Sequence, residues 1–232
     1  MFGRMCSPNI FRRRDFPQIL GSLSTATQPA NPREARNLGP MRVIGGRSRG
    51  RRLKAKLPTT IRPTSDRVRE SIFDILGSLG GVEELNIVDL FCGSGALGVE
   101  ALSRGAASAT FVDRDPDALA AVRENLRAVG LHDADATFVR AELPAWLHTP
   151  AANQRAFDLA LCDPPYNFED WGALLGALRA EMVVMESSSS VAVPDGYVVA
   201  KERRYGSTLV TVAQPVQPLT SSGGAKDEGR PE

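Results

Sequence analysis

One stretch, Asn86 to Glu100, constrains the fold of this chain more than any other. It reads NIVDLFCGSGALGVE and begins with a short apolar run, which is typical of a strand buried on both faces of a parallel sheet. Three glycines follow with the spacing G-x-G-x-x-G, and the apolar residues after them predict a helix. A strand, a glycine turn and a helix N-terminus together form a nucleotide-binding edge in α/β proteins. We expect glycine here because a side chain would block a ligand from the backbone, and because the turn needs positive φ.

The glycine pattern alone fits an NAD-dependent oxidoreductase equally well. Asp89 favours a different ligand, because it lies four residues before Gly93 at the carboxyl end of the strand. A carboxylate there would repel a pyrophosphate and attract a ligand with a cationic sulfonium and an amino group. The pattern Asp-x-x-x-Gly-x-Gly resembles motif I of the S-adenosylmethionine-dependent methyltransferases. We therefore expect S-adenosylmethionine, with S-adenosylhomocysteine as product, to be bound by Asp89, Phe91, Gly93 and Gly95.

Two further acids complete the expected cofactor site. Ala109 to Val112 predicts a second strand, and Asp113 follows it about twenty residues after the first glycine. An acid at this place can accept hydrogen bonds from ribose hydroxyls, whereas Asp115 fits the N-terminus of the next helix. Ala136 to Arg140 predicts a third strand, after which methyltransferases commonly place an acid against the adenine amino group. Either Glu142 or the backbone could serve there.

A second chemically distinctive stretch follows a fourth predicted strand, Phe157 to Cys162. It reads Asp163-Pro164-Pro165-Tyr166, and the two prolines fix the backbone and hold its carbonyls in place. The stretch matches the D/N/S-P-P-Y/F/W motif of methyltransferases that act on amino groups conjugated to a flat ring. We expect Asp163 and Pro164 to accept the hydrogens of the amine and Tyr166 to stack on the base, with Asp163 also beside the donor.

The charge distribution indicates a polyanionic partner. The formal net charge is only +1, but the segment between Arg42 and Arg69 holds ten basic residues and a single acid, Asp66, while acids predominate after it. Met41 to Lys56 predicts a basic hairpin, and Ile61 to Leu76 predicts a helix with arginines crowded at its start. The residues that we expect to contact RNA phosphates are Arg42, Arg47, Arg49, Arg51, Arg52, Arg62, Arg67 and Arg69.

The remaining composition excludes several classes of protein. No apolar run approaches the roughly 20 residues that span a membrane, so we expect no membrane partner. Three scattered cysteines and two histidines indicate neither a disulfide framework nor a metal site. We expect residues 1–40 to be a disordered extension or a mis-assigned start, 41–60 the hairpin, 61–213 the catalytic domain and 214–232 a disordered tail.

Together these motifs support a family resemblance. MRVIGG, RPTSDRVRESIFDIL, DLFCGSGALGVEALSRGA and DPPYN, in this order, resemble the bacterial 16S ribosomal RNA guanine-N2-methyltransferases over about Met41 to Ala213. The resemblance implies a Rossmann-like, seven-stranded, mostly parallel sheet with an antiparallel last strand. It also implies S-adenosylmethionine as methyl donor, a guanine of 16S rRNA in an assembling 30S subunit as acceptor, and no metal. We expect a cytoplasmic monomer.

Three other functions stay open at this point. The same DPPY motif occurs in enzymes that methylate adenine N6 or cytosine N4, although no separate target-recognition domain is visible. A NAD-dependent oxidoreductase would use the same glycines but lacks an obvious hydride-transfer constellation. A non-catalytic RNA-binding protein would not need the Asp163 to Tyr166 stretch.

Overall fold

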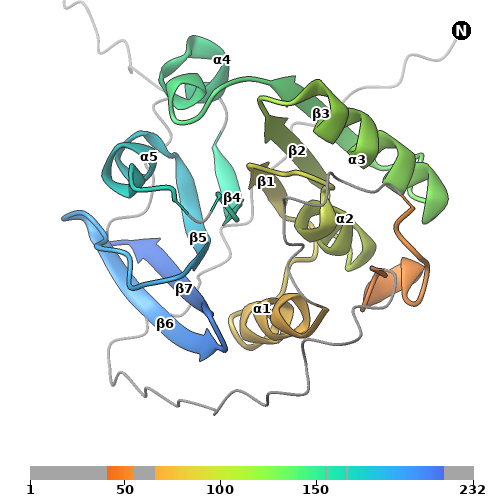
Figure 1. The fold of residues 1–232 in the computed structure, drawn as a ribbon, viewed down its shortest axis with the longest axis horizontal. Helices are drawn as coiled ribbons and strands as arrows, with labels where there is room; N and C mark the ends of the chain where they lie inside the picture. The colour runs from red at the N-terminus through yellow and green to blue at the C-terminus, as the bar shows by residue number, and fades with distance from the viewer. Residues whose placement is uncertain (1–40, 55–65, 155, 166, 217–232) are drawn as a thin grey trace, which may run out of the picture.

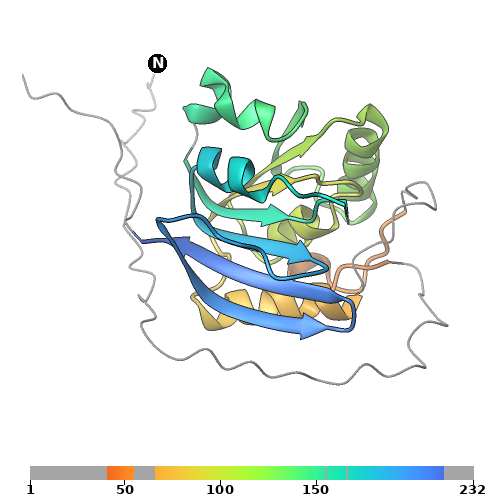
Figure 2. The ribbon, with the colours of Figure 1, turned by 60° about the vertical axis from the view of Figure 1, so that its left-hand side comes forward.

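A computed structural model describes residues 41–54, 66–154, 156–165 and 167–216. Residues 1–40 and 217–232 lie outside the described residues, and so do Arg62 and Tyr166. The described part of the chain forms one mixed sheet covered by helices on both faces, as Figures 1 and 2 show. Within this part, no helix has the length and apolarity that a bilayer crossing would require.

The sheet has seven strands in the order β3-β2-β1-β4-β5-β7-β6. The five strands from β3 to β5 are parallel, and β1 lies in the middle of these five, with β2 on one side and β4 on the other. Strand β7 runs antiparallel to both of its neighbours. This confirms the predicted mostly parallel sheet with an antiparallel last strand. The strands are β1 (Asn86–Leu90), β2 (Ser108–Asp113), β3 (Asp135–Arg140), β4 (Phe157–Cys162), β5 (Ala180–Ser187), β6 (Tyr197–Tyr205) and β7 (Thr208–Pro215).

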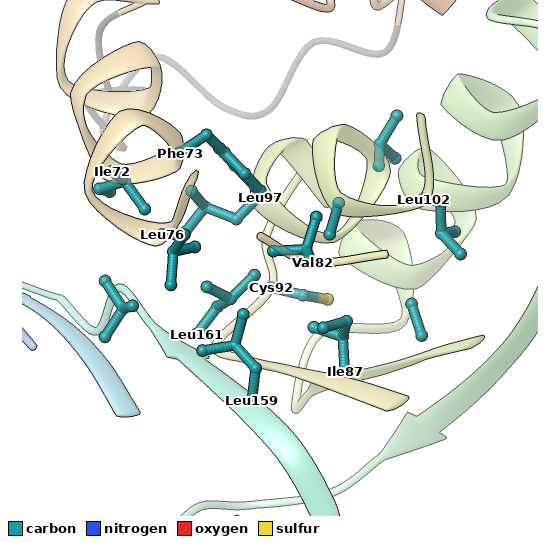
Figure 3. Packing of buried hydrophobic residues seen from close by; sticks show 14 of the residues in the cluster. Ile72, Phe73, Leu76, Val82, Ile87, Cys92, Leu97, Leu102, Leu159 and Leu161 are labelled. Carbon is teal, nitrogen blue, oxygen red and sulfur yellow. The ribbon is translucent and has the colours of Figure 1, made fainter. Parts of the chain in front are cut away.

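Two hydrophobic cores lie on the two faces of the sheet. One packs α1 (Asp66–Ser78), α2 (Ala96–Ser103) and α3 (Pro116–Ala128) onto it. Figure 3 shows part of this core, with Phe73 and Leu76 of α1 above Ile87 and Leu161 of the sheet. The other core packs the 3₁₀ helix η3 (Ala145–His148), α4 (Pro150–Asn153) and α5 (Trp171–Ala177) onto the opposite face. Apolar side chains alternate between the two faces along β1, which explains its continuous apolar run.

The basic hairpin is a short antiparallel loop around the 3₁₀ helix η2 (Gly46–Ser48). Arg42 and Arg52 form an antiparallel bridge, and the N–H of Leu53 donates to the carbonyl of Met41 at 2.9 Å. The hairpin prediction is therefore confirmed for residues 41–54, while 55–60 lie outside the described residues.

Two predicted boundaries differ from the structure. The sequence pattern of Trp171 to Arg179 predicts an amphipathic helix, but α5 ends at Ala177, because Leu178 is already extended and leads into β5. Strand β7 continues to Pro215, past the expected domain end at Ala213, because Gln214 and Pro215 pair with the start of β6. A sequence pattern does not show this pairing, since it depends on the partner strand.

Candidate active site and its basic hairpin

The two predicted motifs meet at one edge of the sheet. Leu90, at the end of β1, pairs with Val112 of β2 and with Cys162 of β4. Parallel strands that end in register place the residues following them at a common edge. The glycine loop and Asp163 therefore begin side by side. Figure 1 shows the strands β2, β1 and β4 from which these segments emerge.

Three carboxyl groups interact electrostatically at this edge. Burial raises the pKa of Asp89 well above its ordinary value, and the charges of Asp163 and Asp113 raise it further, while the N–H of Gly98 lowers it. The carboxyl of Asp89 is 2% exposed and accepts the Gly98 N–H at 2.9 Å. Gly98 lies in the first turn of α2, where N–H groups lack helical partners. Asp89 thus holds the start of α2 against β1, a role that sequence reasoning missed.

Asp113 fixes the glycine loop. Its Oδ2 accepts the N–H of Gly93 and its Oδ1 the N–H of Asp115, both at 2.9 Å. Each carboxylate oxygen has two lone pairs, so Asp113 retains acceptor capacity for a further hydroxyl. Asp115 is the N-cap of α3 and accepts the N–H of Asp117, as predicted.

The glycines of the loop meet two different requirements. Phe91, Gly93 and Gly95 have positive φ values of 58°, 50° and 73°. A Cβ on Gly95 would also lie 2.8 Å from Val122 Cγ2, and one on Gly98 would lie 2.4 Å from Phe111 Cε1. We expected these glycines to give a ligand access to the backbone. At Gly95 and Gly98 the structure shows a further requirement, close packing of α2 against β2 and α3.

An aromatic cluster joins the two loops at this edge. The rings of Phe91 and Phe168 are 5.1 Å apart, and those of Phe168 and Trp171 are 5.2 Å apart, both edge to face. Phe168 lies shortly after Asp163, so the cluster connects the glycine loop with the segment that follows β4. Sequence reasoning assigned no role to Phe168 or Trp171, although two aromatics directly after the DPPY motif were the available signal.

The other predicted site residues differ in how far they are exposed to solvent. Asp163 and Pro164 are half-buried, and Pro165 is exposed. The Pro165 carbonyl accepts the N–H of Phe168 at 2.9 Å. Glu142 is exposed just after β3, and its carbonyl accepts the N–H of Trp146.

Most arginines of the hairpin are exposed but partly engaged. Arg42 pairs with Asp66 at 3.5 Å, Arg47 pairs with Asp133 at 3.6 Å, and Arg51 donates to the carbonyl of Val129 at 2.8 Å. The side chains of Arg49 and Arg52 have no hydrogen-bond or ion-pair partner among the described residues. These two are the most available arginines of the hairpin.

Arg69 does not belong to this surface. Its side chain is 0% exposed, and it donates to Asp66 Oδ1 at 2.8 Å and to the carbonyl of Arg42 at 2.6 Å. The expectation that Arg69 holds an RNA phosphate is wrong, because its guanidinium is not accessible. Its neighbour Arg67 is exposed at the start of α1.

Buried polar side chains dock the hairpin on the helices. Glu100 of α2, 0% exposed, accepts the N–H groups of Ile44 and Gly45 at 2.8 and 2.7 Å and lies 3.8 Å from the Arg69 guanidinium. Ser103 donates to the Gly45 carbonyl and accepts the N–H of Ser48. The hairpin is therefore part of the domain rather than an appended arm.

The sheet order, the antiparallel β7 and the glycine loop after β1 define a Rossmann-like methyltransferase fold. The structure is similar to "Putative methyltransferase yhhF from Escherichia coli" at a TM-score of 0.64 and 28% identity, covering 76% of this chain and 98% of that one. Residues 41–214 match the family model described as Conserved hypothetical protein 95, and the chain belongs to this family.

Curated relatives support the same assignment. The chain is 40% identical over 166 residues to "Putative rRNA methyltransferase YlbH" of Bacillus subtilis, which covers 71% of this chain and 83% of that protein. It is 35% identical over 130 residues to "Ribosomal RNA small subunit methyltransferase D" of Haemophilus influenzae, covering 56% of this chain and 66% of that protein.

Proposed function

We propose that this protein transfers a methyl group from S-adenosylmethionine to the exocyclic N2 amine of a guanine in 16S rRNA. The observation that carries the proposal is the shared edge of the sheet at which the glycine loop and Asp163 lie next to each other. The names of both relatives point to rRNA as the substrate, and that of the Haemophilus influenzae relative points to small-subunit rRNA. The resemblance of the quoted motifs adds the guanine amine.

The residues present fit the methyl donor, which supplies an electrophilic methyl group on a sulfonium. Asp113 would accept the ribose hydroxyls, since its oxygens keep free lone pairs beside the glycine loop. Gly93 and Gly95 would line the donor with backbone, and Phe91 and Glu142 would flank the adenine. The buried carboxyl of Asp89 would favour a cationic ligand, because a nearby positive charge stabilises its charged form.

The acceptor amine is a weak nucleophile, because its lone pair is delocalised into the guanine ring. Asp163 and the carbonyl of Pro164 would accept the hydrogens of the amine and favour a pyramidal nitrogen. Tyr166 would stack on the base and Pro165 would hold the turn rigid. Alignment of the nitrogen with the methyl group is the larger expected contribution, up to about 7 to 11 kcal/mol in favourable cases. The base must leave its stack to reach this edge.

The exposed arginines would hold the RNA backbone. Arg49 and Arg52 have the most available guanidinium groups. Further phosphates would be contacted by Arg42, Arg47, Arg51, Arg62 and Arg67. Phosphate contacts of this kind provide affinity and orientation but no sequence choice. We propose a monomer that acts in the cytoplasm on an assembling 30S subunit.

The test is incubation of the protein with isotope-labelled S-adenosylmethionine and 30S particles that lack the modification, followed by nucleoside analysis. The expected product is N2-methylguanosine at a single position of 16S rRNA. Label in N6-methyladenosine or N4-methylcytidine would favour the alternative acceptor, which the DPPY motif also serves. An absence of label, with RNA still bound, would favour a non-catalytic RNA-binding protein.

A further inference from the structure

Both arms of the basic hairpin reach the glycine loop at the same residue. Ser94 lies between Gly93 and Gly95 and is 8% exposed. Its hydroxyl contacts Met41 Sδ, at the start of the first arm, at 3.9 Å. Its carbonyl is linked to the end of the second arm through one side chain, that of Asn125. The arms are also paired with each other, since the Leu53 N–H donates to the Met41 carbonyl.

Asn125 forms this link with both ends of its amide. It belongs to α3 and is 0% exposed. Its Oδ1 accepts the N–H of Lys54 at 2.8 Å, and its Nδ2 donates to the carbonyl of Ser94 at 3.0 Å. A buried donor or acceptor that is left without a hydrogen-bond partner destabilises the fold by about 1 to 3 kcal/mol. The positions of Lys54 and Ser94 are therefore constrained together.

The glycine loop has little freedom to move independently of this link. On one side of Ser94, the N–H of Gly93 is bonded to Asp113, the proposed ribose ligand. On the other side, Gly95 is the N-cap of α2 and packs closely against Val122. A shift of the second hairpin arm would thus move Ser94, and with it the backbone that lines the proposed donor site.

We propose that Asn125 is a positioning residue that couples RNA binding at the hairpin to donor binding at the glycine loop. This inference rests on the proposed function. Arginines that repel one another oppose the pairing of the two arms, and RNA phosphates remove that repulsion. RNA therefore stabilises the docked arms, which hold Ser94 in place and tighten donor binding. Because coupling between two sites is reciprocal, the donor product also tightens RNA binding by the same factor.

The experiment measures the Kd of S-adenosylhomocysteine for the full chain by calorimetry, with and without saturating unmodified 16S rRNA. We expect RNA to lower this Kd about fivefold or more in the natural sequence, the lower end of common coupling factors. In Asn125→Ser we expect the two Kd values to become nearly equal. A merely structural role would weaken both Kd values and leave their ratio unchanged.

Asn86→Ser is the matched control. Asn86 also bridges two elements, since it donates to Asp158 and accepts from Ser108, but it lies at the amino end of β1, away from the glycine loop. It should keep the coupling factor of the natural sequence. If thermal unfolding shows that Asn125→Ser does not fold, Asn125→Asp keeps the acceptor for Lys54 and replaces the donation to Ser94 by a carboxylate oxygen that repels the Ser94 carbonyl.

The outcomes separate the two proposals. If the natural sequence binds neither S-adenosylhomocysteine nor RNA, the proposed function fails. If it binds both and RNA leaves the Kd of S-adenosylhomocysteine unchanged, the coupling fails and the proposed function stands. A coupling factor that persists in folded Asn125→Ser or Asn125→Asp would also overturn the role of Asn125.

Discussion

Leu90 and Cys162 are paired neighbours at the carboxyl ends of β1 and β4. This single register brings together two segments that are 70 residues apart in the chain, the glycine loop and the DPPY segment. A shift by one residue would turn each side chain of one strand to the opposite face, so the register is set by the two hydrophobic cores. The position of Asp163 beside the glycine loop follows from this core packing.

Replacement of Asp163 by alanine should separate catalysis from donor binding. We expect methyl transfer to fall by about 100-fold or more, because the variant loses the acceptor for the amine hydrogens. Binding of S-adenosylhomocysteine should persist, since the glycine loop and Asp113 are unchanged. Asp170→Ala is the control, because Asp170 is an exposed acid a few residues on that makes no capping bond with its side chain. Near-normal turnover in Asp163→Ala would remove Asp163 from the mechanism.

The buried carboxyl of Asp89 should leave a signature in the pH dependence of stability. Burial, then the charges of Asp163 and Asp113, raise its folded-state pKa. Its stabilising contribution is therefore complete below the unfolded pKa of about 4 and is lost as pH rises toward the folded pKa. Asp89→Asn cannot titrate, so the free energy of unfolding of the variant minus that of the natural sequence should increase from pH 4 to pH 7. Urea denaturation at several pH values measures this difference, and a constant value would contradict the raised pKa.

The local signals in the sequence were sufficient for the central motif and for the order of the elements. The apolar run before Gly93 and the helical pattern after Gly95 are short-range features that the folded structure retains. Asp115 was predicted as a helix-start acid because N-capping needs only its immediate neighbours. The resemblance to a known family supplied the antiparallel direction of β7 relative to the parallel strands.

Residues whose roles depend on distant partners could not be predicted. Arg69 sits in a basic stretch at a helix start. Its neighbour Asp66 pairs with it locally, but the approach of Glu100 from α2 and of the Arg42 carbonyl, which also compensate its burial, depends on the tertiary fold. Glu100 and Asn125 look like ordinary polar helix residues in the sequence. Their burial follows from the docking of the hairpin, which brings backbone N–H groups against them.

The hairpin arginines whose side chains are exposed and unpaired among the described residues, Arg49 and Arg52, should contribute most to RNA affinity. We expect Arg49→Ala combined with Arg52→Ala to weaken RNA binding and to reduce the salt slope of log K by about 1.4 to 1.8, the value for two lost phosphate contacts. The free energy of unfolding should change little, because both side chains are exposed. Binding assays at several salt concentrations measure the slope. Arg203→Ala, an exposed cation of β6, is the control, and an unchanged slope in the double variant would exclude this surface.

Substitution by alanine should change the stability of the protein in opposite directions at two helical glycines. A Cβ on Gly98 would lie 2.4 Å from Phe111 Cε1 and 3.0 Å from the Asp89 carboxylate, whereas one on Gly176 of α5 would meet nothing within 4 Å. Gly98→Ala should destabilise the fold by about 1 to 3 kcal/mol through overpacking. Gly176→Ala should stabilise it by up to about 1 kcal/mol through helix propensity. Thermal unfolding of both variants tests the contrast, which fails if Gly98→Ala is neutral.

Arg69 should matter for stability rather than for direct contact with RNA. Arg69→Met retains much of the buried volume but removes a cation from beside Glu100 and a donor from the Arg42 carbonyl. Removal of one partner from a buried ion pair costs about 3 to 5 kcal/mol. Arg104, which donates to Glu100 Oε1 at 2.8 Å, still compensates part of the Glu100 charge. We therefore expect Arg69→Met to lower the free energy of unfolding by about 3 kcal/mol. The exposed neighbour Arg67→Met should change the free energy of unfolding by about 0.5 kcal/mol or less. Urea denaturation of the two variants decides, because equal losses at the two positions would mean that the buried ion pair does not anchor the hairpin.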